Sequence, residues 1–206
     1  MTLGGRDVQL SARKAREEAK IFVERIDKAQ KLILILDLDN TVVHATLARS
    51  NAEIDAAKSM GVHIVRMSKS QVYLVKVRQY MEYFIKHISR TYLVYIYTHG
   101  TKPYAKKILK LLDPANILSV EDDQIHSWDE GKIEVKTLRN VIPGGDFSRV
   151  LILDDRRDVW PGFKNLIFTS PFIFFDEAHR RKTGNLKTMD HSDCFLFYTT
   201  HLLFDI

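Results

Sequence analysis

Three short apolar runs, each ending in a polar cluster, stand out along the chain. They are residues 32–36, 92–97 and 150–153, which read Leu-Ile-Leu-Ile-Leu, Tyr-Leu-Val-Tyr-Ile-Tyr and Val-Leu-Ile-Leu. Such runs are too short for a lone helix and apolar on both faces, which is typical of a central strand in a parallel sheet covered by helices. The pattern predicts three buried strands.

Helical patterns lie before and between these strands. Residues 12–29 mix Lys, Arg, Glu and Ala with a few apolar positions, which predicts an exposed, partly amphipathic helix. Residues 79–88 and 103–112 predict two more helices, the second with Pro103 in its first turn and Thr101 as its cap. The alternation of strands and helices predicts an α/β fold with a doubly wound, mainly parallel sheet and helices on both faces.

Two segments fall outside this alternation. Residues 43–73 contain a short Ala-rich helix candidate at 52–60 and predict a small insertion after the first strand, covering the site as a lid. Residues 176–193 carry basic side chains at 179–182 and 187, and their polarity predicts a solvated loop. The alternative is that these basic side chains bind a second phosphate of an acidic peptide.

Composition narrows the class of protein. The length of 206 residues suits one compact α/β domain, and the net charge of +5 favours acidic or phosphorylated partners only weakly. Cys194 is the only cysteine, which excludes an internal disulfide and a thiolate zinc site; its apolar neighbours predict that it packs in the core. No apolar run reaches the roughly 20 residues of a membrane span, and no secretion signal is visible at the N-terminus. We expect a soluble, intracellular protein without membrane partners.

Carboxylates gather after two of the predicted strands. Asp37 and Asp39 follow the first strand, and Asp154 and Asp155 follow the third. Ligands of open α/β sheets bind at the carboxyl ends of the strands, so these side chains should converge. Several hard oxygen donors without Cys or paired His favour Mg²⁺. Each acidic pair taken alone is as easily explained as a loop cap.

Two further residues suit the binding of phosphate at this edge. Thr98 ends the second strand just before a helix, where a hydroxyl and backbone N–H groups can receive phosphate oxygens. Lys136 offers a positive charge that would neutralise a phosphoryl group near the carboxylates. Taken singly, Thr98 is explained as a helix cap and Lys136 as a surface charge. The histidines at 44, 63, 99 and 126 form no i, i+4 pair, and we interpret them as ordinary core or surface residues.

Four segments together resemble the signature segments of the Fcp/Scp phosphatases, members of the haloacid dehalogenase (HAD) superfamily that act on the C-terminal domain of RNA polymerase II. They are residues 37–41 (DLDNT), 97–105 (YTHGTKPYA), 135–138 (VKTL) and 153–160 (LDDRRDVW). The resemblance runs from about residue 29 to residue 204. It implies a HAD-like phosphatase domain at 29–206, preceded by an N-terminal helical extension at 1–28.

The resemblance also implies roles for individual residues. Asp37 would be the nucleophile and a Mg²⁺ ligand, and Asp39 the general acid and base, giving the metal its backbone carbonyl. Asp155 would complete the protein's share of the metal ligands, with Asp154 and Thr41 in support. Thr98 and Lys136 would hold the phosphoryl oxygens of the substrate.

The substrate implied by the resemblance is a phosphoserine-containing protein, with RNA polymerase II as the expected partner and the nucleus as the expected location. Two departures from the family pattern are visible. A BRCT domain expected after the catalytic part is absent from this sequence, and Gln79 replaces a proline that commonly follows the arginine matching Arg78.

Alternative functions remain at this point. One is a non-catalytic binding protein similar to the mitochondrial translocase receptor, and another is a small-molecule phosphatase on the same fold. The set of acidic residues with Thr98 and Lys136 argues against the first, and the small insertion, which predicts an open cleft, argues against the second. Direct nucleic-acid binding is disfavoured because the basic residues are not interleaved with stacking aromatic residues.

Overall fold

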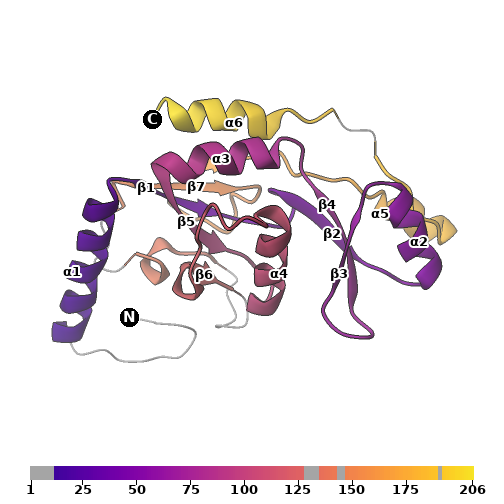
Figure 1. Ribbon diagram of the computed structural model, residues 1–206, viewed down its shortest axis with the longest axis horizontal. Coiled ribbons are helices and arrows are strands. Elements are labelled where there is room, and N and C mark those ends of the chain that lie inside the picture. Colours follow the sequence, from indigo (N-terminus) through magenta and orange to yellow (C-terminus); the bar gives the residue numbers. More distant parts are fainter. Residues whose placement is uncertain (1–11, 128–134, 143–146, 190–191) are drawn as a thin grey trace.

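The computed structural model describes residues 12–127, 135–142, 147–189 and 192–206, and a parallel sheet of five strands lies at its centre (Figure 1). The strand order is β6-β5-β1-β7-β8, and the neighbouring strands all pair in parallel. The strands are β1 (Leu32–Leu36), β5 (Tyr92–Tyr97), β6 (Ile125–His126), β7 (Val150–Asp154) and β8 (Leu166–Phe168). Because β1 is central and the sheet extends on both of its sides, the predicted doubly wound sheet is confirmed.

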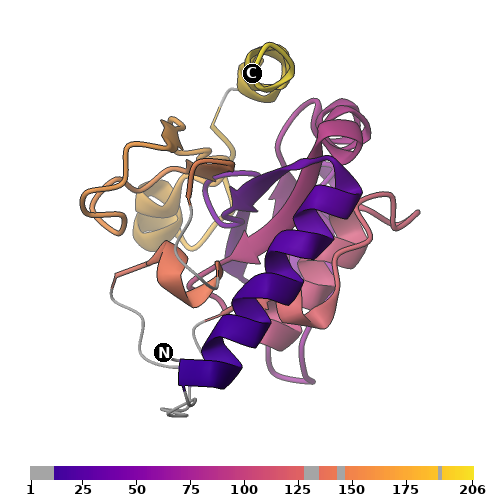
Figure 2. The same ribbon diagram turned by 90° about the vertical axis from the view of Figure 1, so that its left-hand side faces the viewer.

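Alternate residues of the central strand face two separate hydrophobic cores. Leu34 and Leu36 pack with α3 (Met81–Thr91), α4 (Lys102–Leu112) and α6 (Phe195–Phe204) on one face. Ile33 and Ile35 pack on the other face, against α1 (Ala12–Ala29) and the 3₁₀ turn η3 (Leu138–Asn140) (Figures 1 and 2). This alternation follows from the period of two along a strand. A second 3₁₀ turn, η1 (Asp122–Gln124), precedes β6.

The insertion after β1 is a small sheet rather than a lone helix. It contains β2 (Val43–Leu47), α2 (Asn51–Ser59), β3 (His63–Arg66) and β4 (Val72–Val77), and the strands pair antiparallel in the order β2-β4-β3. The Ala-rich helix was predicted, but the three strands were not. In Figure 1 this unit lies to the right of the central sheet and of α4, beside α5 (Glu177–Thr183).

Three sequence predictions about local structure are wrong. The segment expected as a solvated loop contains α5, whose Arg180 is only 1% exposed because acidic partners neutralise it. Cys194 is exposed, because it precedes α6 and the core is filled by Leu196 and residues further along that helix. Helix α3 starts at Met81 rather than residue 79, because Tyr80 adopts a left-handed conformation with φ of 64° that is incompatible with an α-helix.

No helix in the described ranges is long and apolar enough to cross a lipid bilayer.

Candidate active site

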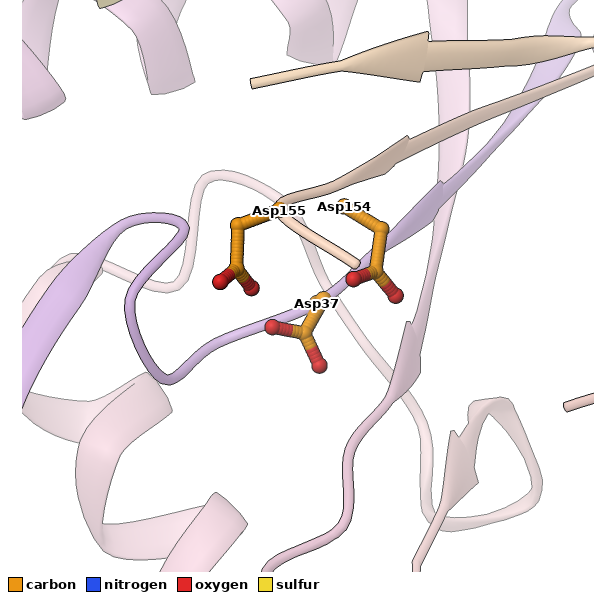
Figure 3. A group of neighbouring side chains, drawn as sticks. All are labelled: Asp37, Asp154 and Asp155. Atoms are coloured by element: carbon orange, nitrogen blue, oxygen red, sulfur yellow. The ribbon is translucent and has the colours of Figure 1, made fainter. Parts of the chain in front are cut away.

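The ends of β1 and β7 bring three carboxylates together. Leu36 pairs with Leu153 in the parallel register, so Asp37 and Asp154 follow side by side. The carboxylate oxygens of Asp37, Asp154 and Asp155 include one atom from each residue that lies within 4.8 Å of the others (Figure 3). Asp37 and Asp154 are buried, whereas Asp155 is partly exposed, so the group opens toward solvent on one side.

Lys136 lies between two of these carboxylates rather than on the surface. Its Nζ donates to Asp37 Oδ1 at 2.6 Å and to Asp154 Oδ2 at 2.7 Å, and its side chain is 1% exposed. Trp160 Nε1 also donates to Asp154 Oδ2, at 2.8 Å. An ammonium has three N–H donors, so the two contacts seen among the described residues leave one N–H that could donate to a substrate oxygen.

Thr41 connects the two strand ends. Its hydroxyl lies within hydrogen-bond distance of two carboxylates as a donor, 3.1 Å from Asp37 Oδ2 and 3.3 Å from Asp155 Oδ1. The same oxygen accepts a hydrogen bond from the backbone N–H of Asp155 at 3.1 Å. A tight turn at Leu38, whose carbonyl accepts the backbone N–H groups of Val42 and Val43, places Thr41 there. The Thr41 carbonyl in turn accepts from Nη1 of the buried Arg78 at 2.8 Å.

Asp39 points to a different partner. Its carboxylate is not part of the three-carboxylate group, and its Oδ1 accepts the hydroxyl of Tyr104 at 2.6 Å. Asp39 and Tyr104 also line a surface pocket of about 440 Å³, which the insertion closes on one side with Met67, Gln71 and Tyr73. The predicted acid and base therefore faces a cavity large enough for a side chain of a bound peptide.

Thr98 lies at the end of β5, the strand next to β1, and is buried. Its Oγ1 accepts the backbone N–H of Gly100 at 2.9 Å, and its own backbone N–H donates to the carbonyl of His126 at 3.0 Å. The structure thus places Thr98 at the same sheet edge as Asp37, with its hydroxyl oxygen stabilising the turn into α4.

Burial governs the protonation of this site. It raises the pKa of Asp37 to about 7, with Lys136 opposing the shift and Asp154 adding to it. Burial also raises the pKa of Asp39, against the hydrogen bond from Tyr104, and the pKa of Asp155. Burial alone would lower the pKa of Lys136, but the charges of Asp37 and Asp154 outweigh it and raise that pKa, so the ammonium is retained.

The donor set fits a hard divalent cation. Among the described residues, Lys136 is the one cation that forms ion pairs with these carboxylates, and it contacts two of the three, so the ionised group carries an excess of negative charge that a divalent ion would balance. The donors are oxygen atoms, which suit Mg²⁺ better than zinc. Asp37, Asp154 and Asp155 could therefore hold such an ion within the described part of the chain.

Three residues that support the site were not predicted from sequence. They are Arg78, Tyr104 and Trp160. Tyr104 and Trp160 fall inside the segments that carry the family resemblance, which was the only available signal. Their contacts join parts of the chain that are far apart or depend on the fold, so no spacing rule finds them.

Comparison with known proteins assigns a family to this geometry. The sequence pattern described as "NLI interacting factor-like phosphatase" matches residues 32–191. The chain is 34% identical over 173 residues to an RNA polymerase II C-terminal domain phosphatase of Encephalitozoon cuniculi, covering 84% of this chain and 39% of that protein. It is 33% identical over 187 residues to the protein of the same name from Schizosaccharomyces pombe, covering 85% and 26%.

Solved structures agree with the sequence matches. The structure titled "The Structure of Fcp1, an essential RNA polymerase II CTD phosphatase" matches with a TM-score of 0.63 at 31% identity, over 80% of this chain and 51% of that one. A fission yeast Fcp1-R271A structure bound to beryllium fluoride matches with a TM-score of 0.69 at 26% identity, over 91% and 65%. This chain therefore spans less than half of the length of the two curated relatives, and between half and two thirds of the chains in the two solved structures.

Proposed function

The chain belongs to the NLI interacting factor-like phosphatase family, and from this premise we propose that it removes phosphate from phosphoserine or phosphothreonine side chains of a protein through an aspartyl-phosphate on Asp37. The observation that carries this proposal is the arrangement of Asp37, Asp154 and Asp155 around Lys136 at the strand ends. A nucleophilic carboxylate, a fixed positive charge and additional metal-ligand oxygens are what transfer of a phosphoryl group to an aspartate requires.

In the first half-reaction, a carboxylate oxygen of Asp37 attacks phosphorus and the bond from phosphorus to the serine oxygen breaks. Asp39 donates its proton to the departing oxygen, which leaves as the serine hydroxyl. Lys136 uses two N–H groups to contact Asp37 and Asp154, and its third N–H would donate to a phosphoryl oxygen and offset the negative charge there. Thr98, at the adjacent strand end, would bind another phosphoryl oxygen.

In the second half-reaction, the Asp39 carboxylate takes a proton from water. The oxygen of that water attacks phosphorus, the bond from phosphorus to Asp37 breaks, and inorganic phosphate leaves. Asp37 is again a carboxylate and Asp39 again carries a proton, so the residues return to their starting state. Burial, which raises the pKa of Asp39, supports its presence as an acid in the first half-reaction.

Mg²⁺ is the proposed cofactor, held by the carboxylates of Asp37 and Asp155 and the backbone carbonyl of Asp39, with Asp154 beside them. When bound, it would supply positive charge next to the attacking carboxylate and the phosphoryl oxygens. Thr41 supports this arrangement because its hydroxyl contacts both Asp37 and Asp155.

The proposed substrate is the phosphorylated C-terminal domain of RNA polymerase II, and the proposed location is the nucleus. Support comes from the names of the relatives in Encephalitozoon cuniculi and Schizosaccharomyces pombe. We also propose that residues 29–206 form the phosphatase domain and residues 1–28 an N-terminal helical extension. Phe22 and Ile26 attach the end of that extension to the core.

Hydrolysis assays test the proposal. The purified chain should hydrolyse p-nitrophenyl phosphate and phosphoserine heptad peptides only when Mg²⁺ is present, and should prefer the peptides to sugar phosphates. Asp37→Asn should lower activity by about four orders of magnitude or more, because it removes an essential nucleophile. Asp55→Asn removes an exposed carboxylate on α2 and serves as the matched control. An inactive wild-type chain with Mg²⁺ would favour a binding role instead, and a preference for sugar phosphates would favour a metabolite phosphatase.

A further inference from the structure

Tyr104 contacts the proposed acid and base but takes no part in the steps above. It lies near the start of α4, is 5% exposed, and donates its hydroxyl hydrogen to Asp39 Oδ1 at 2.6 Å. The bond joins residues 65 positions apart in sequence, so it depends on the fold and not on a local turn.

The ring of Tyr104 is fixed from several directions. Tyr73 of β4 packs against it with ring centroids 5.0 Å apart and an interplanar angle of 50°. The backbone N–H of Tyr104 donates to Thr101 Oγ1 at 3.4 Å. Gly100 leaves space for the ring, because a Cβ there would lie 2.8 Å from Tyr104 Cδ1, closer than real Cβ contacts allow. Gly100 does not have a positive φ, so its reason to be glycine is this close approach.

Tyr104 affects the two oxygens of Asp39 differently. A hydrogen bond from Tyr104 to Oδ1 occupies that oxygen as an acceptor and restricts rotation of the carboxyl group. The proton that Asp39 transfers would then reside on Oδ2. Asp39 and Tyr104 line the same pocket, so with Oδ1 held against the phenol, Oδ2 is the oxygen that would be available to a leaving group bound there.

We infer that Tyr104 is a positioning residue that fixes the orientation of the Asp39 carboxyl group for proton transfer to the leaving serine oxygen. This inference rests on the proposed function, because it needs Asp39 to act as the acid. Tyr104 touches neither the phosphoryl group nor a metal ion in this scheme. It acts through Asp39, by keeping one oxygen and one rotamer available for the reaction.

The test compares two leaving groups in the Tyr104→Phe variant, which loses only the hydroxyl. p-Nitrophenolate leaves without protonation, whereas a serine alkoxide needs a proton from Asp39. The value of kcat/KM reports steps up to phosphorylation of Asp37, so the later hydrolysis step does not enter. We expect kcat/KM for a phosphoserine peptide to fall about 10-fold or more, within the range of general acid catalysis, and the value for p-nitrophenyl phosphate to change less than about 3-fold.

The design separates the inference from a loss of folding and from failure of the proposed function. Both substrates are measured on one preparation, so the ratio of their kcat/KM values does not depend on the folded fraction. Tyr83→Phe, which removes a hydroxyl on the remote helix α3, is the matched control and should leave the ratio unchanged. An equal loss for both substrates in Tyr104→Phe, or no loss, would overturn the inference. If Asp39→Asn also leaves the ratio unchanged, the proposed role of Asp39 fails instead.

Discussion

Arg180 provides a stringent test of how the insertion is attached to the rest of the molecule. This side chain is 1% exposed and donates to Glu53 Oε1 at 2.8 Å and Oε2 at 2.6 Å, which is a bidentate ion pair. It also donates to Glu177 at 2.9 Å, to Thr46 Oγ1 at 2.6 Å and to the carbonyl of Leu47 at 2.6 Å. The guanidinium therefore holds α5 against β2 and α2 of the insertion.

Arg180→Met removes the charge while keeping a long apolar side chain. Glu53 is 6% exposed, so its carboxylate would be left buried with its main partner gone. Removing one partner of a buried ion pair costs about 3–5 kcal/mol. Because native proteins have unfolding free energies of about 5–15 kcal/mol, this change would remove a large part of the stability.

Urea unfolding followed by circular dichroism measures the effect. Arg180→Met should lower the free energy of unfolding by about 3–5 kcal/mol at neutral pH. Arg181→Met, in the same helix, is the control and should change this free energy by less than about 0.5 kcal/mol. Among the described residues, the Arg181 side chain makes only an exposed contact with a backbone carbonyl. A decrease in unfolding free energy of less than about 1 kcal/mol in Arg180→Met would refute the reasoning, since a buried carboxylate that loses its ion-pair partner should destabilise the fold by more than that.

The same pair predicts a pH dependence. The hydrogen bond from Arg180 lowers the pKa of Glu53 below its ordinary value of 4.5 in the folded state. The contribution of Glu53 to stability is therefore fully present above pH 4.5 and is lost as the pH falls through the lowered pKa. The difference in unfolding free energy between wild type and Arg180→Met should accordingly be largest near neutral pH and should shrink on acidification below about pH 4.5. A difference that is constant or grows on acidification would contradict this linkage.

Two further predictions concern the site. Mg²⁺ should raise the Tm of the wild-type chain, by the equivalent of about 2.7 kcal/mol of stability at a hundredfold excess over Kd, and Asp155→Asn should strongly reduce that shift. Calorimetry measures both, and a wild-type Tm that does not respond to Mg²⁺ would contradict the cation site. Gly100→Ala should lower the free energy of unfolding by about 1–3 kcal/mol, because the new Cβ would lie 2.8 Å from the ring of Tyr104. Urea unfolding measures this change, and an unchanged midpoint would show that the ring moves freely.

The central sheet could be predicted from sequence because its strands are short and apolar on both faces. The bounds of β1 and β5 agree with the predicted runs, and β7 includes one further residue, Asp154. The strands of the insertion were harder to predict. Strands β2 and β3 mix polar and apolar residues, and β4 carries Lys76 after a short apolar stretch. Each of the three strands is buried at only some positions, so they resemble the buried central strands less closely.

The acidic residues of the candidate site could be predicted because they lie at or just after the ends of predicted strands. Their contacts could not be predicted, since the tertiary fold decides them. A lone lysine suggests a surface charge, yet Lys136 is buried between two carboxylates. Arg180 stood in a segment that suggested a solvated loop, and it is buried because Glu53, more than a hundred residues earlier in the chain, neutralises it.

The most direct test of the central claim is to trap the phosphorylated enzyme. The wild-type chain would be mixed with a ³²P-labelled phosphoserine peptide and Mg²⁺, quenched in acid during turnover, digested, and the labelled fragment sequenced. We predict a label that is released by hydroxylamine, as expected of an acyl phosphate, in the fragment that contains Asp37, and no label in Asp37→Asn. A stable label on another residue, or an equal label in Asp37→Asn, would contradict the account.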